Sequence, residues 1–206
     1  MQRLYFVRHG QTELNLGKRV QGAIDSPLLD QSRVEAKKTG TFLAETNIQH
    51  IISSPQLRAW ETAQHIQDHL GREVILEVDD RLKEMGYGEW EGLFIPELAQ
   101  THPELFHHLR QEPHLYDPAS FGGESYQDLI QRGSECIIEH AEAHPEMDLL
   151  FVGHSIHFMS TLLTLTGHPL KDIRSYPPLG NTSVTCLQRD GNTFTIDFWN
   201  HVDHLK

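Results

Sequence analysis

Near its amino terminus the chain reads Leu4-Tyr5-Phe6-Val7-Arg8-His9-Gly10-Gln11-Thr12. A short apolar run ends there in an arginine, a histidine and a glycine, and such a run predicts a buried strand. Ligands of open α/β sheets bind just beyond the carboxyl ends of the strands. Arginine supplies a fixed cationic fork, histidine a nucleophile, acid or base near neutral pH, and glycine a close backbone approach. The stretch therefore predicts a strand with a ligand site at its end.

Two further strand ends carry residues of the same kind. Residues 50–53 form a β-branched run followed by Ser54-Pro55, and Arg58 falls in the first turn of the helix expected there. A helix N-terminus attracts anions through its free N–H groups and its dipole. Residues 149–152 form an apolar run that ends in Gly153-His154. If the three strands are neighbours, two arginines and two histidines face one pocket, which suits a dianionic phosphoryl group.

The rest of the chain alternates strands with helices, which predicts one α/β domain with a mainly parallel sheet. Asp30 is expected to cap a helix over residues 31–45, and Ser54 a helix that ends at Gly71. A further strand is expected at residues 74–78, and further helices at residues 96–110, 125–143 and 156–165. A closing hairpin is expected at residues 184–187 and 194–198. Residues 11–30 are interpreted as a loop.

Composition limits the class of protein. The 206 residues suit a single domain, 1–206, with a lid-like insertion at about 79–123. The formal charge of −12, without a basic stripe, argues against a nucleic-acid partner. The apolar runs are too short for a transmembrane helix, so we expect no membrane partner. Without a signal-peptide pattern and with only two cysteines, the chain is expected to be cytoplasmic. The oligomeric state is left open.

Histidine is abundant, with 15 residues in the chain. Three pairs have helical spacing that could suit a metal: His65/His69, His154/His157 and His201/His204. No cluster of cysteines or carboxylates completes a ligand set beside any of them. We therefore expect no metal site and no cofactor.

Glu84, in the lid-like insertion, is a candidate proton donor for phosphoryl transfer. One histidine can attack phosphorus as a nucleophile, and a carboxylic acid must then protonate the leaving alkoxide. Glu84 follows the strand expected at residues 74–78 and is available for that role. The residues alone do not distinguish phosphoryl from sulfuryl transfer.

Five segments resemble, in order, the motifs of the histidine phosphatase superfamily, the phosphoglycerate mutase-like enzymes. They are Arg8–Asn15, Ser53–Thr62, Leu82–Gly92, Gly122–Ser125 and Val152–Ser155. The match spans nearly the whole chain. The resemblance implies a three-layer α/β sandwich, in which a six-stranded, mainly parallel mixed sheet has helices on both faces.

The resemblance also implies catalytic roles. His9 would be the nucleophile that forms a phosphohistidine. Arg8, Arg58 and His154 would hold the phosphoryl oxygens in the ground and transition states. Glu84 would donate a proton to the leaving group and then accept one from the attacking water. The chemistry would need no metal.

Substrate binding is implied at Asn15 and at the backbone near Gln21 and Gly22, which match family positions that help bind phosphate or substrate. The stretch Gly88–Gly92 is of the Gly-x-Trp-Glu-Gly kind found in broad-range phosphatases. Cofactor-dependent mutases have a more basic stretch there, which binds a second phosphate. We therefore favour hydrolysis of a small phosphorylated metabolite over mutase transfer within a phosphoglycerate-like substrate. A catalytically idle phosphate-sensing module is a third hypothesis, and the presence of all five catalytic residues opposes it.

The side chains over the pocket set the substrate. The expected cations are Lys83, Arg110 and the histidines His102, His107, His108 and His114 of the insertion, with Lys18 and Arg19 from the first loop. The aromatic residues Tyr87, Trp90, Phe106 and Tyr116 are interpreted as packing within the lid rather than as substrate contacts.

Overall fold

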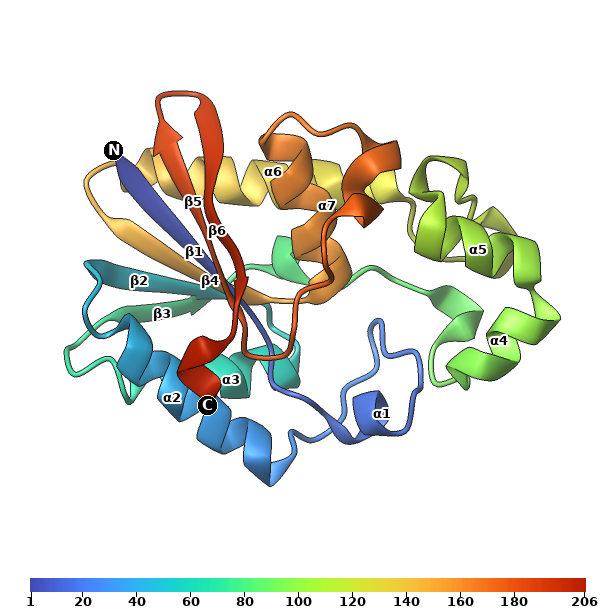
Figure 1. Ribbon diagram of the computed structural model, residues 1–206, viewed down its shortest axis with the longest axis horizontal. Coiled ribbons are helices and arrows are strands. Elements are labelled where there is room, and N and C mark those ends of the chain that lie inside the picture. The colour runs from blue at the N-terminus through green and yellow to red at the C-terminus, as the bar shows by residue number, and fades with distance from the viewer.

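One six-stranded sheet forms the centre of the computed structural model, which describes residues 1–206 (Figure 1). Its strands are β1 (Gln2–Arg8), β2 (Ile48–Ser53), β3 (Ile75–Val78), β4 (Asp148–Gly153), β5 (Val184–Asp190) and β6 (Thr193–His201). The strand order is β3-β2-β4-β1-β5-β6. Strands β3, β2, β4 and β1 are parallel to one another. Strand β5 pairs antiparallel with β1, and β6 pairs antiparallel with β5. The expected mixed α/β sheet is confirmed.

Helices cover both faces of this sheet (Figure 1). One face carries α2 (Asp30–Leu43) and α3 (Leu57–Gln67), and the other carries α6 (Tyr126–Ala143) and α7 (Ser155–Leu165). Three short helices lie away from the sheet: α1 (Glu13–Leu16), α4 (Ile95–Thr101) and α5 (Pro103–Gln111). The arrangement is a three-layer sandwich with a separate helical extension at one end.

The residues of β1 explain why the layers form. Side chains of a strand alternate between its two faces. Leu4 and Phe6 pack into the core under α6 and α7, whereas Tyr5 and Val7 pack into the core under α2 and α3. Because both faces are covered, the strand reads as a continuous apolar run instead of an alternating one.

The strand order brings the three expected strand ends together. β4 lies between β2 and β1, and all three are parallel, so their carboxyl ends lie at one edge of the sheet. Arg8 is level with Gly153, and Ser53 is level with Val152. The prediction that these ends converge is confirmed.

Residues 79–123 leave the sheet after β3 and form the helical extension of Figure 1. They have an apolar cluster of their own, which also takes in Tyr126 and Leu129 of α6 and Ile156 and Leu163 of α7. The segment is therefore packed on the ends of α6 and α7.

Three helix predictions are wrong in detail. The insertion holds two helices, not one over residues 96–110, because Pro103 starts α5 immediately after α4 has ended. Leu29, not Asp30, is the N-cap of α2, and Asp30 is the first helical residue. The loop at residues 11–30 contains α1, which is capped by Thr12.

The helix after β2 begins later than expected. Gln56 is its N-cap, so the Ser54 hydroxyl does not cap it, and α3 ends at Gln67 before the turn at Gly71. Ser54 instead contacts a histidine of another strand end. By contrast, Ser125 does cap its helix, α6, by accepting from the N–H of Asp128. None of the helices is long and apolar enough to span a membrane.

Candidate active site

A cavity of about 280 Å³ opens at the carboxyl edge of β1, β2 and β4. Its lining comes from the strand ends, the first loop, the 79–123 segment and the chain after α7. It includes Arg8, His9, Asn15, Arg19, Gln21, Gly22, Arg58, Glu84, Tyr87, Phe106, Arg110, Ser155 and Arg174. All the predicted site residues except His154 therefore line one cavity, and His154 lies directly behind it.

His9 is held in one orientation at the end of β1. Its backbone N–H donates to the Gly153 carbonyl and its carbonyl accepts from Asn181 Nδ2, so both ends of the residue are fixed. Its ring Nδ1 lies 2.7 Å from the Gly10 carbonyl, which can only accept, so Nδ1 carries the hydrogen and Nε2 has the lone pair. Burial, with the charges of Arg58 and Arg8, places the pKa of His9 well below 6.5. The imidazole is therefore neutral at pH 7.

Two arginines hold positive charge beside His9. Arg58 is only 1% exposed, and its guanidinium donates to the Gly22 and Ile24 carbonyls and pairs with Asp25 at 3.0 Å. Arg8 donates to the Leu179 carbonyl at 2.7 Å. Burial lowers the pKa of both guanidiniums, while the carboxylate of Glu84 opposes that shift.

In both arginines the Nε atom is buried and lacks a hydrogen-bond partner within the protein. Buried polar groups are normally satisfied, so these two N–H groups indicate a missing acceptor. A bound anion at this edge of the sheet would supply it.

His154, at the end of β4, lies behind His9. Its ring centroid lies 5.1 Å from that of His9. Its Nε2 lies 2.9 Å from the Ser54 hydroxyl, and its Nδ1 is buried without a partner. Burial, with the charge of Arg58, places the pKa of His154 well below 6.5, so this ring is also neutral. Sequence reasoning assigned Ser54 to a helix cap and missed its contact with His154.

Glu84 reaches the same cavity from the 79–123 segment. Its Oε1 accepts from the N–H groups of Met85 at 2.9 Å and His157 at 3.0 Å, and its Oε2 has only a 3.4 Å contact with the N–H of Ile156. The carboxylate is thus anchored at the N-terminus of α7, where the helix dipole favours it. Oε2 is the oxygen with spare capacity to hold or give a proton.

The first loop places Asn15, Gln21 and Gly22 in the lining, but two of these side chains also hold the loop. Asn15 Oδ1 accepts from the Thr12 N–H in a capping box, and Gln21 Oε1 accepts from the Thr12 hydroxyl. Gly22 has a φ of +53°, and a Cβ there would lie 2.2 Å from Glu91 Oε1, so only glycine fits. Its carbonyl accepts from Arg58, which fixes that guanidinium.

The outer part of the cavity holds Arg19, Arg110 and Arg174, which we call the outer arginines. Arg19 and Arg110 were candidates for this position, but Lys83 does not line the cavity and pairs with Asp80 instead. The histidines named with them at positions 102, 107, 108 and 114 are also absent from the lining. Sequence reasoning missed Arg174, because nothing in its neighbourhood marks a site and only the fold brings it there.

Some aromatic residues of the insertion line the cavity, and others pack inside the insertion itself. Tyr87 and Phe106 line the cavity, while Trp90 and Tyr116 pack around Phe121 inside the segment. Burial raises the pKa of Tyr87 well above 10, so its phenol is a neutral hydrogen-bond donor.

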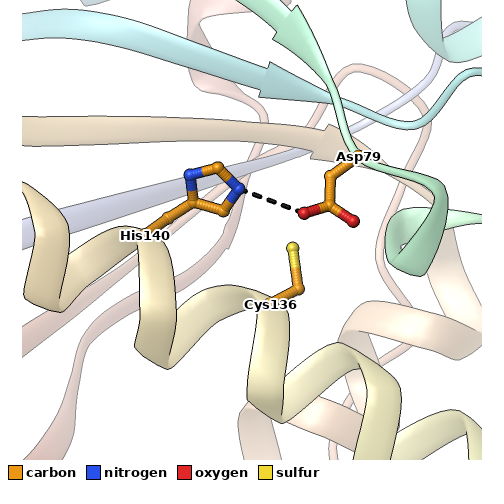
Figure 2. Close-up of side chains that lie close together, drawn as sticks. All are labelled: Asp79, Cys136 and His140. Carbon is orange, nitrogen blue, oxygen red and sulfur yellow. Dashed lines mark hydrogen bonds and ion pairs between the residues drawn. The ribbon is translucent and has the colours of Figure 1, made fainter.

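Asp79, Cys136 and His140 are the side chains that could hold a metal ion (Figure 2). Cys136 and His140 extend from one face of α6 toward Asp79, which follows β3, and His140 Nε2 lies 3.1 Å from Asp79 Oδ2. Burial raises the pKa of the Cys136 thiol, and Arg81 already occupies the Asp79 carboxylate. None of the three lines the cavity. The cluster therefore lies apart from the cavity, and its Asp79 carboxylate contacts both Arg81 and His140.

Comparison with known proteins agrees with this geometry. The family model of the histidine phosphatase superfamily (branch 1) matches residues 4–202. The solved structure of Bacillus stearothermophilus YhfR is 34% identical, covers all of both chains and superposes with a TM-score of 0.93. Phosphoserine phosphatase 1 of Hydrogenobacter thermophilus is 30% identical over 85% of this chain and 82% of its own.

A further relative is the glucosyl-3-phosphoglycerate phosphatase of Mycobacterium tuberculosis, 28% identical over 96% of this chain and 94% of its own. The resemblance inferred from the five motifs is therefore confirmed over the length of the chain. The protein belongs to the histidine phosphatase superfamily, branch 1, as a phosphoric monoester hydrolase.

Proposed function

We propose that the protein hydrolyses small phosphorylated metabolites through a phosphohistidine formed on His9. The observation that carries the proposal is the state of the His9 ring. Its Nδ1 hydrogen is committed to the Gly10 carbonyl, and its depressed pKa leaves the Nε2 lone pair free at neutral pH. A neutral, oriented imidazole between two arginines is arranged for attack on a phosphoryl group.

The first step transfers the phosphoryl group to the enzyme. The Nε2 lone pair of His9 attacks phosphorus, the P–O bond to the ester oxygen breaks, and that oxygen leaves with its electron pair. Protonated Glu84 gives its proton to this oxygen, so the product leaves as a neutral alcohol. Oε2 of Glu84 suits this transfer, because it has only the 3.4 Å contact with the Ile156 N–H, whereas Oε1 accepts from two backbone N–H groups.

The second step returns the enzyme to its starting state. Glu84, now a carboxylate, takes a proton from water as the water oxygen attacks phosphorus. The P–N bond breaks, its electron pair returns to His9 Nε2, and inorganic phosphate is released. Because one carboxyl group first gives and then accepts a proton, the cycle needs no other acid or base.

Three groups stabilise the charge on the phosphoryl oxygens in this proposal. Arg8 and Arg58 line the cavity beside His9, and His154 lies behind it. In this proposal the two guanidiniums and the His154 ring face the oxygens of the transferring group. Such preorganised donors usually make the largest single contribution to phosphoryl-transfer catalysis.

Asn15, Gln21 and Gly22 support substrate binding from the first loop. All three line the cavity, and the Nδ2 of Asn15 can donate because its Oδ1 alone serves the cap of α1. Residues 79–123 act as a lid of the single domain, since they supply Glu84, Tyr87 and Phe106 to the cavity from outside the sheet.

The size of the site supports a small substrate. A cavity of about 280 Å³ lies just below the usual range for ligand pockets, about 300 to 1,000 Å³, and suits a compact metabolite. The named relatives act, by their names, on phosphoserine and glucosyl-3-phosphoglycerate. Both are phosphate monoesters of small molecules.

The test is hydrolysis of p-nitrophenyl phosphate and of a panel of phosphorylated metabolites in the presence of EDTA. We expect turnover to survive EDTA and an acid-labile phosphoenzyme to be trapped. His9→Asn should reduce kcat about 10⁴-fold or more and abolish the trapped label, because no other nucleophile is positioned. Label retained on that variant would overturn the assignment of His9.

Transfer within a phosphoglycerate is the competing activity. Incubation with 3-phosphoglycerate and a catalytic amount of 2,3-bisphosphoglycerate distinguishes the two. Release of inorganic phosphate supports hydrolysis, and formation of 2-phosphoglycerate without phosphate release contradicts it. A catalytically idle protein would give neither product and no phosphoenzyme.

A further inference from the structure

Gln56 is the N-cap residue of α3, but its side chain does not cap the helix. N-cap side chains are usually short, and they accept from the first N–H groups of their own helix. The Gln56 amide makes no such contact, although the residue is only 7% exposed. A buried amide is normally hydrogen-bonded, and the partners of this one lie in the first loop and in the 79–123 segment.

The Gln56 amide joins two backbone groups from different walls of the cavity. Its Nε2 donates to the Gly22 carbonyl at 2.7 Å, and its Oε1 accepts from the Glu84 N–H at 2.9 Å. A carbonyl can only accept and a peptide N–H can only donate, so the two partners fix the orientation of the amide. The bridge therefore needs a side chain that donates and accepts at the same time.

The Gly22 end of this bridge belongs to the wall that holds Arg58. Gly22 lines the cavity, and its carbonyl also accepts from Arg58 Nη2 at 2.8 Å. Arg58 has two further partners, the Ile24 carbonyl and the Asp25 carboxylate, so its position does not depend on Gln56 alone. The Gly22 carbonyl is therefore the fixed end of the bridge.

The Glu84 end of the bridge belongs to a segment outside the sheet. Arg132 of α6 holds this segment by donating to the carbonyls of Lys83 and Glu84, and it pairs with Glu124 at 2.6 Å. The N–H of Glu84 donates to Gln56 instead. The backbone of Glu84 is thus held at its carbonyl from α6 and at its N–H from the start of α3.

Gln56 itself does not line the cavity. It lines a second hollow of about 440 Å³, together with Glu84, Gly86 and Arg132. Because Glu84 lines both spaces, it is not enclosed by packed side chains, and its hydrogen bonds must set its position. A residue that does not line the cavity affects the reaction only through the groups that it positions.

We propose that Gln56 is a positioning residue, which keeps the Glu84 carboxyl group within reach of the leaving oxygen by tying the Glu84 N–H to the Gly22 carbonyl. A general acid acts over a hydrogen-bond distance, and a misplacement of about 1 Å can cost about 100-fold in rate. Gln56 would thereby link the loop that holds Arg58 to the acid that protonates the product. The inference rests on the proposed function, because Gln56 acts through Glu84.

Gln56→Met tests the bridge, because it keeps the length of the side chain and removes both hydrogen bonds. In single-turnover measurements we expect phosphoryl transfer from an alkyl ester of the metabolite panel, such as phosphoserine, to slow about 10- to 100-fold. Transfer from p-nitrophenyl phosphate should slow less than about threefold, because nitrophenolate leaves without a proton. Equal losses on the two substrates, or native rates on both, overturn the proposal.

Gln64→Met is the matched control, since Gln64 is an exposed residue of the same helix and does not line the cavity. It should leave both rates near the native values. A double-mutant cycle then shows whether Gln56 acts through Glu84. Once Glu84→Gln has removed the acid, adding Gln56→Met should slow transfer from the alkyl ester by less than about threefold. A further loss as large as that in the native background contradicts the proposal.

Binding of inorganic phosphate shows whether the pocket of the variant is intact. Calorimetric titration of Gln56→Met should give a dissociation constant within about threefold of the native value, because Arg8 and Arg58 keep their other partners. Loss of phosphate binding contradicts a role through Glu84. Failure of the proposed function gives a different result, since Glu84→Gln alone would then show no selective loss on the alkyl ester. A selective loss in Glu84→Gln without one in Gln56→Met removes only the positioning role.

Discussion

Arginines at the inner and outer ends of the cavity are held in different ways. Arg58, at the inner end, is 1% exposed and its guanidinium meets two carbonyls and a carboxylate. Arg19 and Arg110, at the outer end, are exposed and have no carboxylate partner. The inner end is built from strand ends that the sheet fixes, and the outer end from loops and short helices. We infer that the sheet determines the reaction, while the surrounding segments determine the substrate.

Glu84 reaches the cavity from the 79–123 segment, and after His9 its replacement has the largest expected effect. Glu84→Gln keeps an oxygen for the N–H groups of Met85 and His157 but has no proton to give. We expect about 10²- to 10⁴-fold slower hydrolysis of an alkyl phosphate and a much smaller loss with p-nitrophenyl phosphate, whose phenolate leaves without protonation. Single-turnover measurement of both substrates tests this.

Glu89→Gln is the matched control, because Glu89 is an exposed residue of the same segment and does not line the cavity. It should leave both rates near the native values. Equal losses on the two substrates in Glu84→Gln would remove Glu84 from the acid role. Catalysis would then need no side chain from residues 79–123.

Ser54→Ala is expected to have an intermediate effect. A hydroxyl that donates to His154 Nε2 keeps the hydrogen of this neutral ring on Nδ1, the atom proposed to face the phosphoryl group. Loss of that contact lets the ring adopt the other tautomer, and we expect kcat to fall about 10- to 100-fold. Nitrogen-15 NMR of the His154 ring reports the tautomer directly, and Ser54→Thr should restore it.

Ser53→Ala provides the comparison for this variant. Ser53 is equally buried and adjacent, but its hydroxyl donates to the Ser54 carbonyl instead of contacting the ring. An unchanged His154 spectrum in Ser54→Ala, or the same change in Ser53→Ala, would show that Ser54 does not position the ring.

The last prediction concerns stability, and it distinguishes the buried histidines from the exposed histidines of the 79–123 segment. Burial places the pKa values of His9, His154 and His157 well below 6.5, whereas in the unfolded chain they titrate near that value. The unfolded state therefore binds more protons below pH 6.5. The free energy of unfolding is therefore highest above that pH and falls as the pH decreases.

Urea unfolding at pH 7, 6 and 5 measures this slope. His157→Gln should make the slope shallower by one histidine's share, whatever its effect on absolute stability. His114→Asn replaces an exposed histidine of the 79–123 segment and should keep the native slope. A native slope in His157→Gln would contradict the assignment of a buried, neutral ring.

Much of the inner end could be predicted from the sequence. The apolar runs before Arg8, Ser54 and Gly153 indicate parallel strands, and parallel strands place their carboxyl ends at one edge. The position of Arg58 in the first turn of a helix follows from its distance from the preceding strand. These relations are local, because they depend on which residue follows which element.

Only the tertiary structure decided which side chains from distant parts of the chain meet at the cavity. Arg174 and Ser54 show why, since each contacts a partner far away in the chain: Arg174 reaches Leu109, and Ser54 reaches His154. Local patterns fix where a strand or helix ends, but a side chain's partner across the fold depends on strand order and loop path. The sequence by itself therefore determined the sheet and the residues at its edge that we propose to react. The packing of distant segments decided which arginines surround them, because those segments contact one another only after the sheet has formed.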